Sequence, residues 1–167
     1  MTASVFPLHF ESGVTLNATP EIAFSYLDDF RMLSAHMETS TAMMMGSKMR
    51  ITLDALEGRA VGSKVRMDGK IFGMTLSLEE VVMQRQPPLS KSWQTINAKL
   101  LVIGQYRLGF ALSPSDGRSL LRVFIDYELP QHGLARWLGK LFGKMYARWC
   151  TEQMANDAAV HFNSATF

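Results

Sequence analysis

The amino-acid sequence predicts an α+β fold: a curved antiparallel sheet of about seven strands wrapped round a long C-terminal helix, with two short helices after the first strand. From about Ser40 to Tyr127, apolar and polar residues alternate with a period of two between short turns, which is typical of half-buried antiparallel strands. From Gly133 to Phe162, apolar residues recur at helical spacing. About 30 residues of helix span roughly 45 Å, enough to cover one face of such a sheet.

Length and composition predict one globular domain over residues 1–167. The chain is 47% hydrophobic and 19% charged, which is typical of a packed domain and unlike a disordered chain. The formal charge of +2 is too small to indicate a polyanionic partner, so we expect no nucleic acid to bind.

Cysteine usage and the termini predict a cytoplasmic protein. Cys150 is the single cysteine, so no intramolecular disulfide can form, which fits a reducing compartment. Residues Met1 to Phe10 lack the basic and apolar regions of a signal peptide. No apolar run approaches the ~18 residues of a membrane span.

The first strand and the two short helices follow from local patterns. An imperfect alternation from Leu8 to Leu16 predicts the first strand. Thr19 and Pro20 then mark a helix start, because threonine caps helices well and proline at the first helical position loses no hydrogen bond. A second short helix is expected over Phe30 to His36.

Six further strands are predicted from alternation. They lie at Met49–Leu53, Val65–Ile71, Met74–Leu78, around Trp93, Tyr106–Leu112 and Leu121–Tyr127. The turn between the second and third of these is ambiguous: Asp68-Gly69 is a good hairpin dipeptide, but Phe72-Gly73 leaves longer and better matched strands, and we favour it. Pro87-Pro88 and Pro130 end strands, because proline cannot donate to a ladder.

The long helix has two stripes. The apolar stripe is expected to face the sheet and consists of Leu134, Trp137, Leu138, Leu141, Phe142, Met145 and Trp149. The basic ridge, expected to face solvent, consists of Arg136, Lys140, Lys144 and Arg148.

Strand parity predicts which residues face this helix. The inner face of the sheet should carry Met67, Met74, Leu76, Tyr106, Leu108, Phe110, Val123, Ile125 and Tyr127. The outer face should carry Arg66, Arg107, Arg122 and Asp126.

The order of elements and several short stretches resemble the helix-grip fold of the START/Bet v 1-like (SRPBCC) superfamily, in particular bacterial members of its polyketide cyclase/dehydrase and lipid-transport group. The stretches are Gly62 to Arg66, Pro87-Pro88 followed by Trp93, Gly104 to Arg107, Phe124 to Tyr127 with Pro130, and Tyr146 to Cys150. The resemblance implies a cavity between sheet and helix. It does not imply one activity, since the superfamily includes hydrolases, cyclases, lipid carriers and ubiquinone-binding proteins.

We find no catalytic motif in the sequence. The four histidines show no pair at metal-ligand spacing, and one cysteine cannot form a zinc cluster. There is no phosphate-binding loop and no nucleophile elbow. Glu79 and Glu80 are adjacent on a strand and point to opposite faces, so they cannot act as a carboxylate pair. We predict neither a metal nor a cofactor.

Candidate ligand-binding residues are those expected on the two facing surfaces. They are Met67, Met74, Trp93, Tyr106, Phe110, Ile125 and Tyr127 from the strands and Met145, Trp149, Glu152 and Asn156 from the helix. Glu152 continues the apolar stripe, and a carboxylate there must be paired, neutral or wet. Each candidate also has a purely structural alternative. Glu152 could be exposed or ion-paired, and the aromatic and methionine residues could simply fill the core.

Three functions fit these observations. The first is binding of a hydrophobic or amphipathic small molecule, such as a lipid, an isoprenoid or a polyketide-like ring system. The second is a metal-independent polyketide cyclase or dehydratase, with Glu152, Tyr106 and Tyr127 as candidate acids or bases. The third is delivery of lipid at a membrane surface through the basic ridge. The ligand and the oligomeric state stay open.

Overall fold

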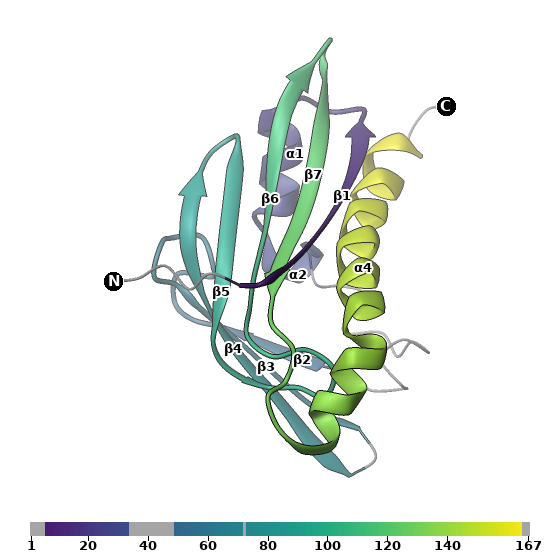
Figure 1. The fold of residues 1–167 in the computed structure, drawn as a ribbon. Helices are drawn as coiled ribbons and strands as arrows, with labels where there is room; N and C mark the ends of the chain where they lie inside the picture. Colours follow the sequence, from purple (N-terminus) through teal and green to yellow (C-terminus); the bar gives the residue numbers. More distant parts are fainter. Residues whose placement is uncertain (1–5, 34–48, 72, 165–167) are drawn as a thin grey trace.

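The structure, a computed structural model, describes residues 6–33, 49–71 and 73–164. Its helices and strands follow the expected order (Figure 1). They are β1 (Leu8–Leu16), α1 (Pro20–Leu27), α2 (Phe30–Leu33), β2 (Met49–Leu53), β3 (Lys64–Ile71), β4 (Met74–Gln86), β5 (Ser90–Lys99), β6 (Tyr106–Ser115), β7 (Arg118–Tyr127) and α4 (Gly133–Asn163).

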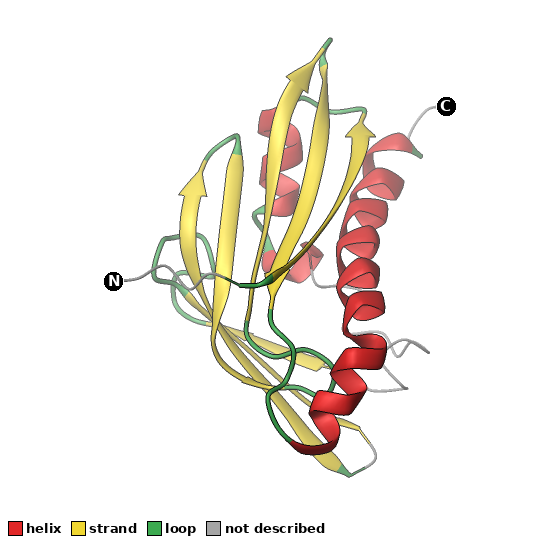
Figure 2. Ribbon diagram, viewed as in Figure 1, coloured by secondary structure: helices red, strands yellow, loops and turns green. Residues whose placement is uncertain are grey.

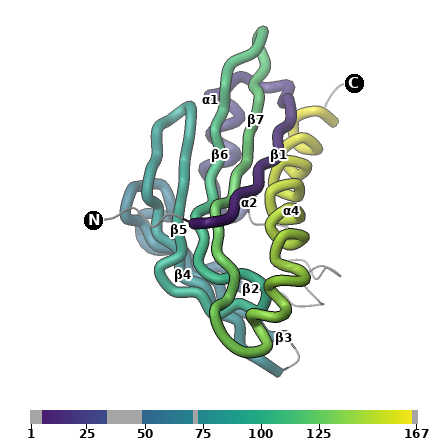
Figure 3. The backbone as a smooth tube through the Cα atoms, in the orientation of Figure 1, coloured from purple at the N-terminus to yellow at the C-terminus, as the bar shows by residue number. Residues whose placement is uncertain are grey.

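The seven strands form one antiparallel sheet, which confirms the predicted fold class. The strand order is β1-β7-β6-β5-β4-β3-β2, so every strand from β2 to β7 pairs with its neighbour in sequence, and β1 pairs with β7. The sheet is strongly curved: β2 and β3 run obliquely to β6 and β7 (Figure 3). This curvature leaves one concave face for the helices.

The alternating segments of the sequence locate the strands but not their full length: β4 continues from Leu78 to Gln86, β6 continues from Leu112 to Ser115, and β7 begins at Arg118. β3 ends at Ile71 and β4 begins at Met74, and Gly73 has a φ of 78°, so the turn favoured from the sequence is confirmed. Glycine adopts such a left-handed conformation without the steric cost that a side chain would bring. Residues 34–36, the end of the predicted second helix, lie outside the described residues.

The predicted parity of the strands is also confirmed. The residues expected on the inner face are buried or half-buried, with one exception. Met74 is 48% exposed, because it begins β4 beside the turn. On the outer face, Arg66, Arg107 and Arg122 are exposed, and Asp126 is half-buried.

Among the described residues, three helices pack against the sheet. α1 lies across β6 and β7, α2 follows α1 and packs on β5 through Phe30, and α4 runs alongside β1 (Figure 2). The Phe24 ring of α1 packs on Phe110 with centroids 5.6 Å apart, and the Phe30 ring of α2 packs on Trp93 at 4.9 Å. Two of the candidate ligand-binding aromatics, Phe110 and Trp93, therefore contribute to the core between sheet and short helices.

A buried ion cluster fixes the C-terminal end of α1 to the sheet. The Asp28 carboxylate accepts hydrogen bonds from the guanidinium of Arg85 at 2.8 Å and from Lys91 Nζ at 2.9 Å. Lys91 Nζ also donates to the Asp28 carbonyl at 2.8 Å. Burial alone would raise the pKa of Asp28, but hydrogen bonds from Arg85 and Lys91 outweigh it and lower the pKa. The buried charges of Asp28 and Lys91 are thus mutually compensated.

The predicted orientation of α4 is wrong. Most of its apolar stripe faces solvent: Leu134, Trp137, Leu141, Phe142 and Met145 are 72%, 59%, 53%, 42% and 48% exposed. The buried face instead carries small or slender residues. These are Gly139, Gly143, Ala147, Cys150, Thr151, Met154, Ala155 and Ala158.

Glycine on the buried face lets α4 lie very close to two loops. A Cβ atom at Gly143 would lie 2.7 Å from Leu129 Cδ2 and 2.9 Å from the Val102 carbonyl oxygen. A Cβ atom at Gly139 would lie 2.7 Å from Pro130 Cδ. These distances are shorter than normal van der Waals contacts, so the large residues of the apolar stripe could not occupy this face.

We predict that Gly143→Ala destabilises the protein. The added methyl group must displace Leu129 and the Val102 backbone, and overpacking of this kind costs about 1–3 kcal/mol. The better helix propensity of alanine returns at most about 1 kcal/mol. Urea unfolding should therefore show a lower free energy of unfolding. Lys144→Ala on the exposed side is the control and should change it by less than about 0.5 kcal/mol. A Gly143→Ala protein more stable than the wild type would contradict the close approach.

Candidate functional site

The candidate site is built around Glu80, a carboxyl inside the apolar core. Glu80 lies on β4, and its side chain continues the inward series of Leu78 and Val82. It is 1% exposed. Burying an uncompensated charged carboxylate is strongly unfavourable, so its partners and its protonation state determine what this position can do.

Among the described residues, Glu80 has one hydrogen-bond partner for its two oxygens. The Tyr106 hydroxyl on β6 donates to Glu80 Oε1. The Tyr106 backbone N–H donates to Thr95 Oγ1 at 2.9 Å, which holds the tyrosine at this point of the sheet. Oε2 of Glu80 is buried and has no hydrogen-bond partner among the described residues. Such an unsatisfied buried oxygen is rare in folded proteins.

Two polar groups of α4 lie near this carboxyl. Tyr146 and Cys150 are four residues apart and therefore share a helix face, and each affects the other's pKa. Both lie close enough to Glu80 for its charge to raise their pKa values. Glu80, Tyr106, Tyr146 and Cys150 thus form a cluster of polar groups that shift one another's pKa values within apolar surroundings.

Burial determines the protonation states in this cluster. It raises the pKa of Glu80 to about 7, although the hydrogen bond from Tyr106 and the nearby Trp93 side chain oppose this rise. It raises the pKa of Cys150 to about 12 and that of Tyr106 well above its usual value. Near neutral pH, Cys150 is therefore a thiol and a poor nucleophile. Glu80 is the group that can gain or lose a proton there.

Some residues predicted for the site do lie together. Trp93 and Tyr106 both adjoin Glu80, and Tyr127 lies directly opposite Tyr106 in the β6–β7 ladder. Met67, Phe110 and Ile125 are buried in the same core. Trp149 is half-buried, and its ring lies 5.8 Å from that of Tyr146.

The other predicted residues lie elsewhere. The Glu152 side chain is 41% exposed and accepts a hydrogen bond from Arg148 Nε at 2.8 Å, which is the ion-paired alternative left open by the sequence. Met145 and Asn156 are exposed on α4, and Met74 is exposed at the start of β4. Met145, Glu152 and Asn156 lie outside the site because α4 is oriented with its small residues toward the core.

Sequence reasoning missed Glu80, Tyr146 and the place of Cys150 near them. Glu80 was set aside as one half of an adjacent carboxylate pair. Extending the alternation of Leu76 and Leu78 by one more step places Glu80 on the inner face, so the signal was available.

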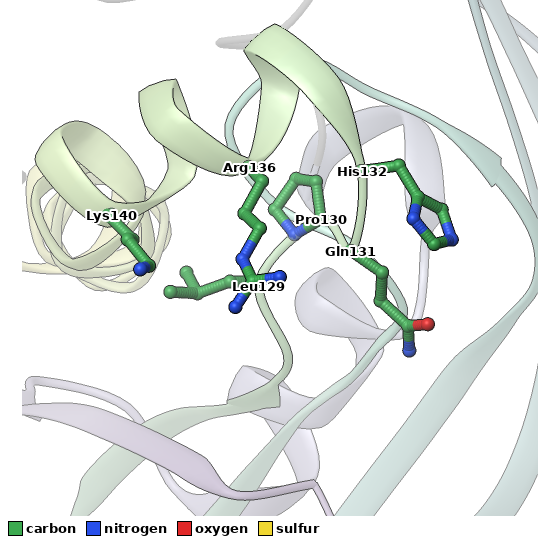
Figure 4. Close-up of a pocket in the computed structure, with 6 residues that line it drawn as sticks. All are labelled: Leu129, Pro130, Gln131, His132, Arg136 and Lys140. Carbon is green, nitrogen blue, oxygen red and sulfur yellow. The ribbon is translucent and has the colours of Figure 1, made fainter.

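A pocket of about 460 Å³ lies at the connection from β7 to α4 (Figure 4). Leu129 and Pro130 form its apolar part. Its polar part consists of Gln131, His132, Arg136 and Lys140. This pocket is on the surface and is separate from the polar cluster in the core.

Known structures share this architecture across nearly the whole chain. The structure of TTHA0849 from Thermus thermophilus is 14% identical, with 96% of this chain and 100% of that one covered at a TM-score of 0.68. The Zhui aromatase/cyclase from a Streptomyces species is 15% identical over 92% and 94% of the two chains, with a TM-score of 0.61. A START superfamily protein from Mycobacterium smegmatis is 19% identical over 95% and 99%, with a TM-score of 0.59.

The chain has the helix-grip fold of START and Bet v 1-like proteins. This confirms the fold that the resemblance implied. No protein-family model matches the chain, and no curated protein sequence matches it. At these sequence identities the structural similarity establishes the helix-grip fold only, and the activity depends on the residues of the site.

The described residues contain neither a candidate metal-binding cluster nor a helix that could span a membrane. No cluster of three or more histidine, cysteine, aspartate or glutamate side chains among them could hold a metal ion. No helix in this part of the chain is long and apolar enough to span a bilayer.

We predict that Glu80 makes the stability of the protein depend on pH. The pKa of Glu80 rises from 4.5 to about 7 on folding, so the folded state binds the proton more tightly than the unfolded state. Stability is therefore highest below about pH 4.5 for this group and falls as pH rises through 7, by on the order of 3 kcal/mol. Glu80→Gln cannot ionise and should remove this fall.

Urea unfolding of both proteins at pH 5 and pH 8 measures the effect. The difference between wild type and Glu80→Gln isolates Glu80 from other titrating groups. Glu79→Gln, the partly exposed neighbour, is the matched control. Equal pH dependence in wild type and Glu80→Gln would show that Glu80 does not hold its proton in the folded protein.

Proposed function

We propose that the protein binds a hydrophobic or amphipathic small molecule between the sheet and α4, with the Glu80 carboxyl as its polar contact. The observation that carries this proposal is the buried Oε2 atom of Glu80, which lacks a hydrogen-bond partner among the described residues. A ligand atom that completes this hydrogen bond would remove the cost of the unsatisfied oxygen. The helix-grip fold supports the proposal, since the chain shares it with the Zhui aromatase/cyclase.

The surroundings indicate the chemistry of the ligand. Neutral Glu80 can donate its proton to a carbonyl oxygen or accept a hydrogen bond from a hydroxyl group. Around it, Trp93, Tyr106 and Tyr127 present aromatic surface. A largely apolar molecule with one carbonyl or hydroxyl group, such as a lipid, an isoprenoid or a polyketide-like ring system, fits this combination.

A pair of matched probes tests the polar contact. We expect 2-acetylnaphthalene to bind more tightly than 2-ethylnaphthalene, because only the former has an oxygen for Glu80. One hydrogen bond in a buried site corresponds to a difference of roughly 5- to 100-fold in affinity. Calorimetric titration of the wild type, Glu80→Leu and the control Glu79→Leu measures it.

Glu80→Leu should lose the preference while keeping its affinity for 2-ethylnaphthalene, and Glu79→Leu should behave as the wild type. Native mass spectrometry and organic extraction of the purified wild type give an independent readout of a co-purified ligand. Equal affinity of the wild type for both probes would exclude Glu80 as the polar contact.

A second function, cyclisation or dehydration of a bound polyketide, is favoured by one further observation. A pKa of about 7 lets Glu80 both donate and accept a proton near neutral pH. In an aldol cyclisation such a group can take a proton from the carbon beside one carbonyl and return it to the oxygen of the carbonyl that is attacked. This assigns the acid–base role to Glu80 in place of the exposed Glu152.

Turnover of a β-polyketone thioester mimic tests this second function. We expect Glu80→Gln to lower kcat by at least about 100-fold, the usual contribution of general acid–base catalysis, and Glu152→Gln to leave it unchanged. Wild-type activity should change with an apparent pKa near 7, set by Glu80. Full turnover by Glu80→Gln would exclude Glu80 as the catalytic group.

A further inference from the structure

The N-terminal half of α4 carries an exposed apolar stripe. Leu134, Trp137, Leu141 and Met145 are spaced by three or four residues and so lie on one side of the helix. All four are about half exposed or more. Scattered exposed apolar residues are normal on a protein surface, but a contiguous group of this size marks an interaction surface.

The basic ridge flanks this stripe. Arg136, Lys140, Lys144 and Arg148 recur every four residues, and no acidic residue lies between Gly133 and Thr151. Among the described residues, Arg148 pairs with Glu152, whereas Arg136, Lys140 and Lys144 form no ion pair. The surface therefore has three uncompensated positive charges beside an apolar stripe.

We propose that this half of α4 docks on an anionic lipid bilayer. The four exposed apolar residues of this half, from Leu134 to Met145, would enter the boundary between headgroups and acyl chains. The basic ridge would lie at the level of the lipid phosphates. A helix with apolar residues on one side and lysine or arginine beside them is the usual form of an interfacial helix. Trp137 supports this placement, because tryptophan prefers the interface of a membrane.

The pocket beside α4 fits the same orientation. Arg136 and Lys140 line it together with His132 (Figure 4). Both basic residues also belong to the ridge, so a lipid phosphate drawn to the ridge has room beside the helix. Charge complementarity thus extends from the ridge into the pocket.

Charge also argues against a second copy of this chain as the partner. Two copies joined through this face would bring two basic ridges together, and like charges at close range are unfavourable. An anionic bilayer compensates them instead, at roughly a fivefold gain in affinity per basic residue. The proposal does not depend on the function proposed for Glu80, since the two surfaces lie on opposite sides of α4.

Vesicle co-sedimentation at low salt tests the proposal. The wild type should sediment with vesicles of phosphatidylcholine and phosphatidylglycerol but not with phosphatidylcholine alone. Arg136→Gln/Lys140→Gln/Lys144→Gln should lose on the order of 100-fold in vesicle affinity. The matched control, Lys70→Gln/Lys99→Gln/Arg118→Gln, removes three exposed basic residues elsewhere and should lose much less.

Trp137 reports insertion directly. Brominated lipid tails should quench the fluorescence of the bound wild type, and most of this quenching should be absent in Trp137→Phe. Three outcomes would each overturn the proposal. They are equal loss of binding in both triple variants, no preference for anionic vesicles, and no quenching of Trp137. So would a stable dimer in analytical ultracentrifugation that dissociates on Leu141→Gln, because this would make a second copy the partner.

Discussion

The close approach of α4 to the loops at Val102 and Leu129 is the constraint on which both proposed surfaces depend. Because Gly143 has no side chain, the helix backbone lies where a Cβ atom would meet the Val102 carbonyl oxygen at 2.9 Å. This contact sets the rotation of the helix about its axis. With that rotation, Tyr146 and Cys150 lie near Glu80, while the large residues between Leu134 and Met145 lie on the outside.

The core combines this tight packing with a carboxyl that the fold does not fully satisfy. Tyr106 provides one hydrogen bond to Glu80, and a pKa of about 7 lets the group stay neutral when the site is dry. In the Asp28 cluster, by contrast, Arg85 and Lys91 compensate a buried carboxylate and lower its pKa. The two buried acids differ in their partners, and only Glu80 is left with an oxygen available to another molecule.

The sheet could be predicted from the sequence almost completely, because alternation over Met67, Tyr106 and Ile125 directly encodes which side of a strand is buried. The orientation of α4 could not. Helical periodicity identifies an apolar side, but whether that side faces the core depends on the space available, which here only small residues fit. The spacing of Gly139 and Gly143 by four residues was the sequence signal for this close packing.

The site was predicted in part for related reasons. Tyr106 was found because an aromatic residue on an inner face is visible in the alternation, and Trp93 because it is an aromatic residue with a polar group on a predicted strand. Glu80 was missed because it was considered only together with Glu79 as a possible carboxylate pair, and its own place in the alternation was not followed. The cost of burying a carboxylate applies to the charged form. Once the group is neutral near pH 7, the same burial that seems to exclude Glu80 makes it the strongest candidate, since low polarity both retains the proton and strengthens any hydrogen bond the proton makes.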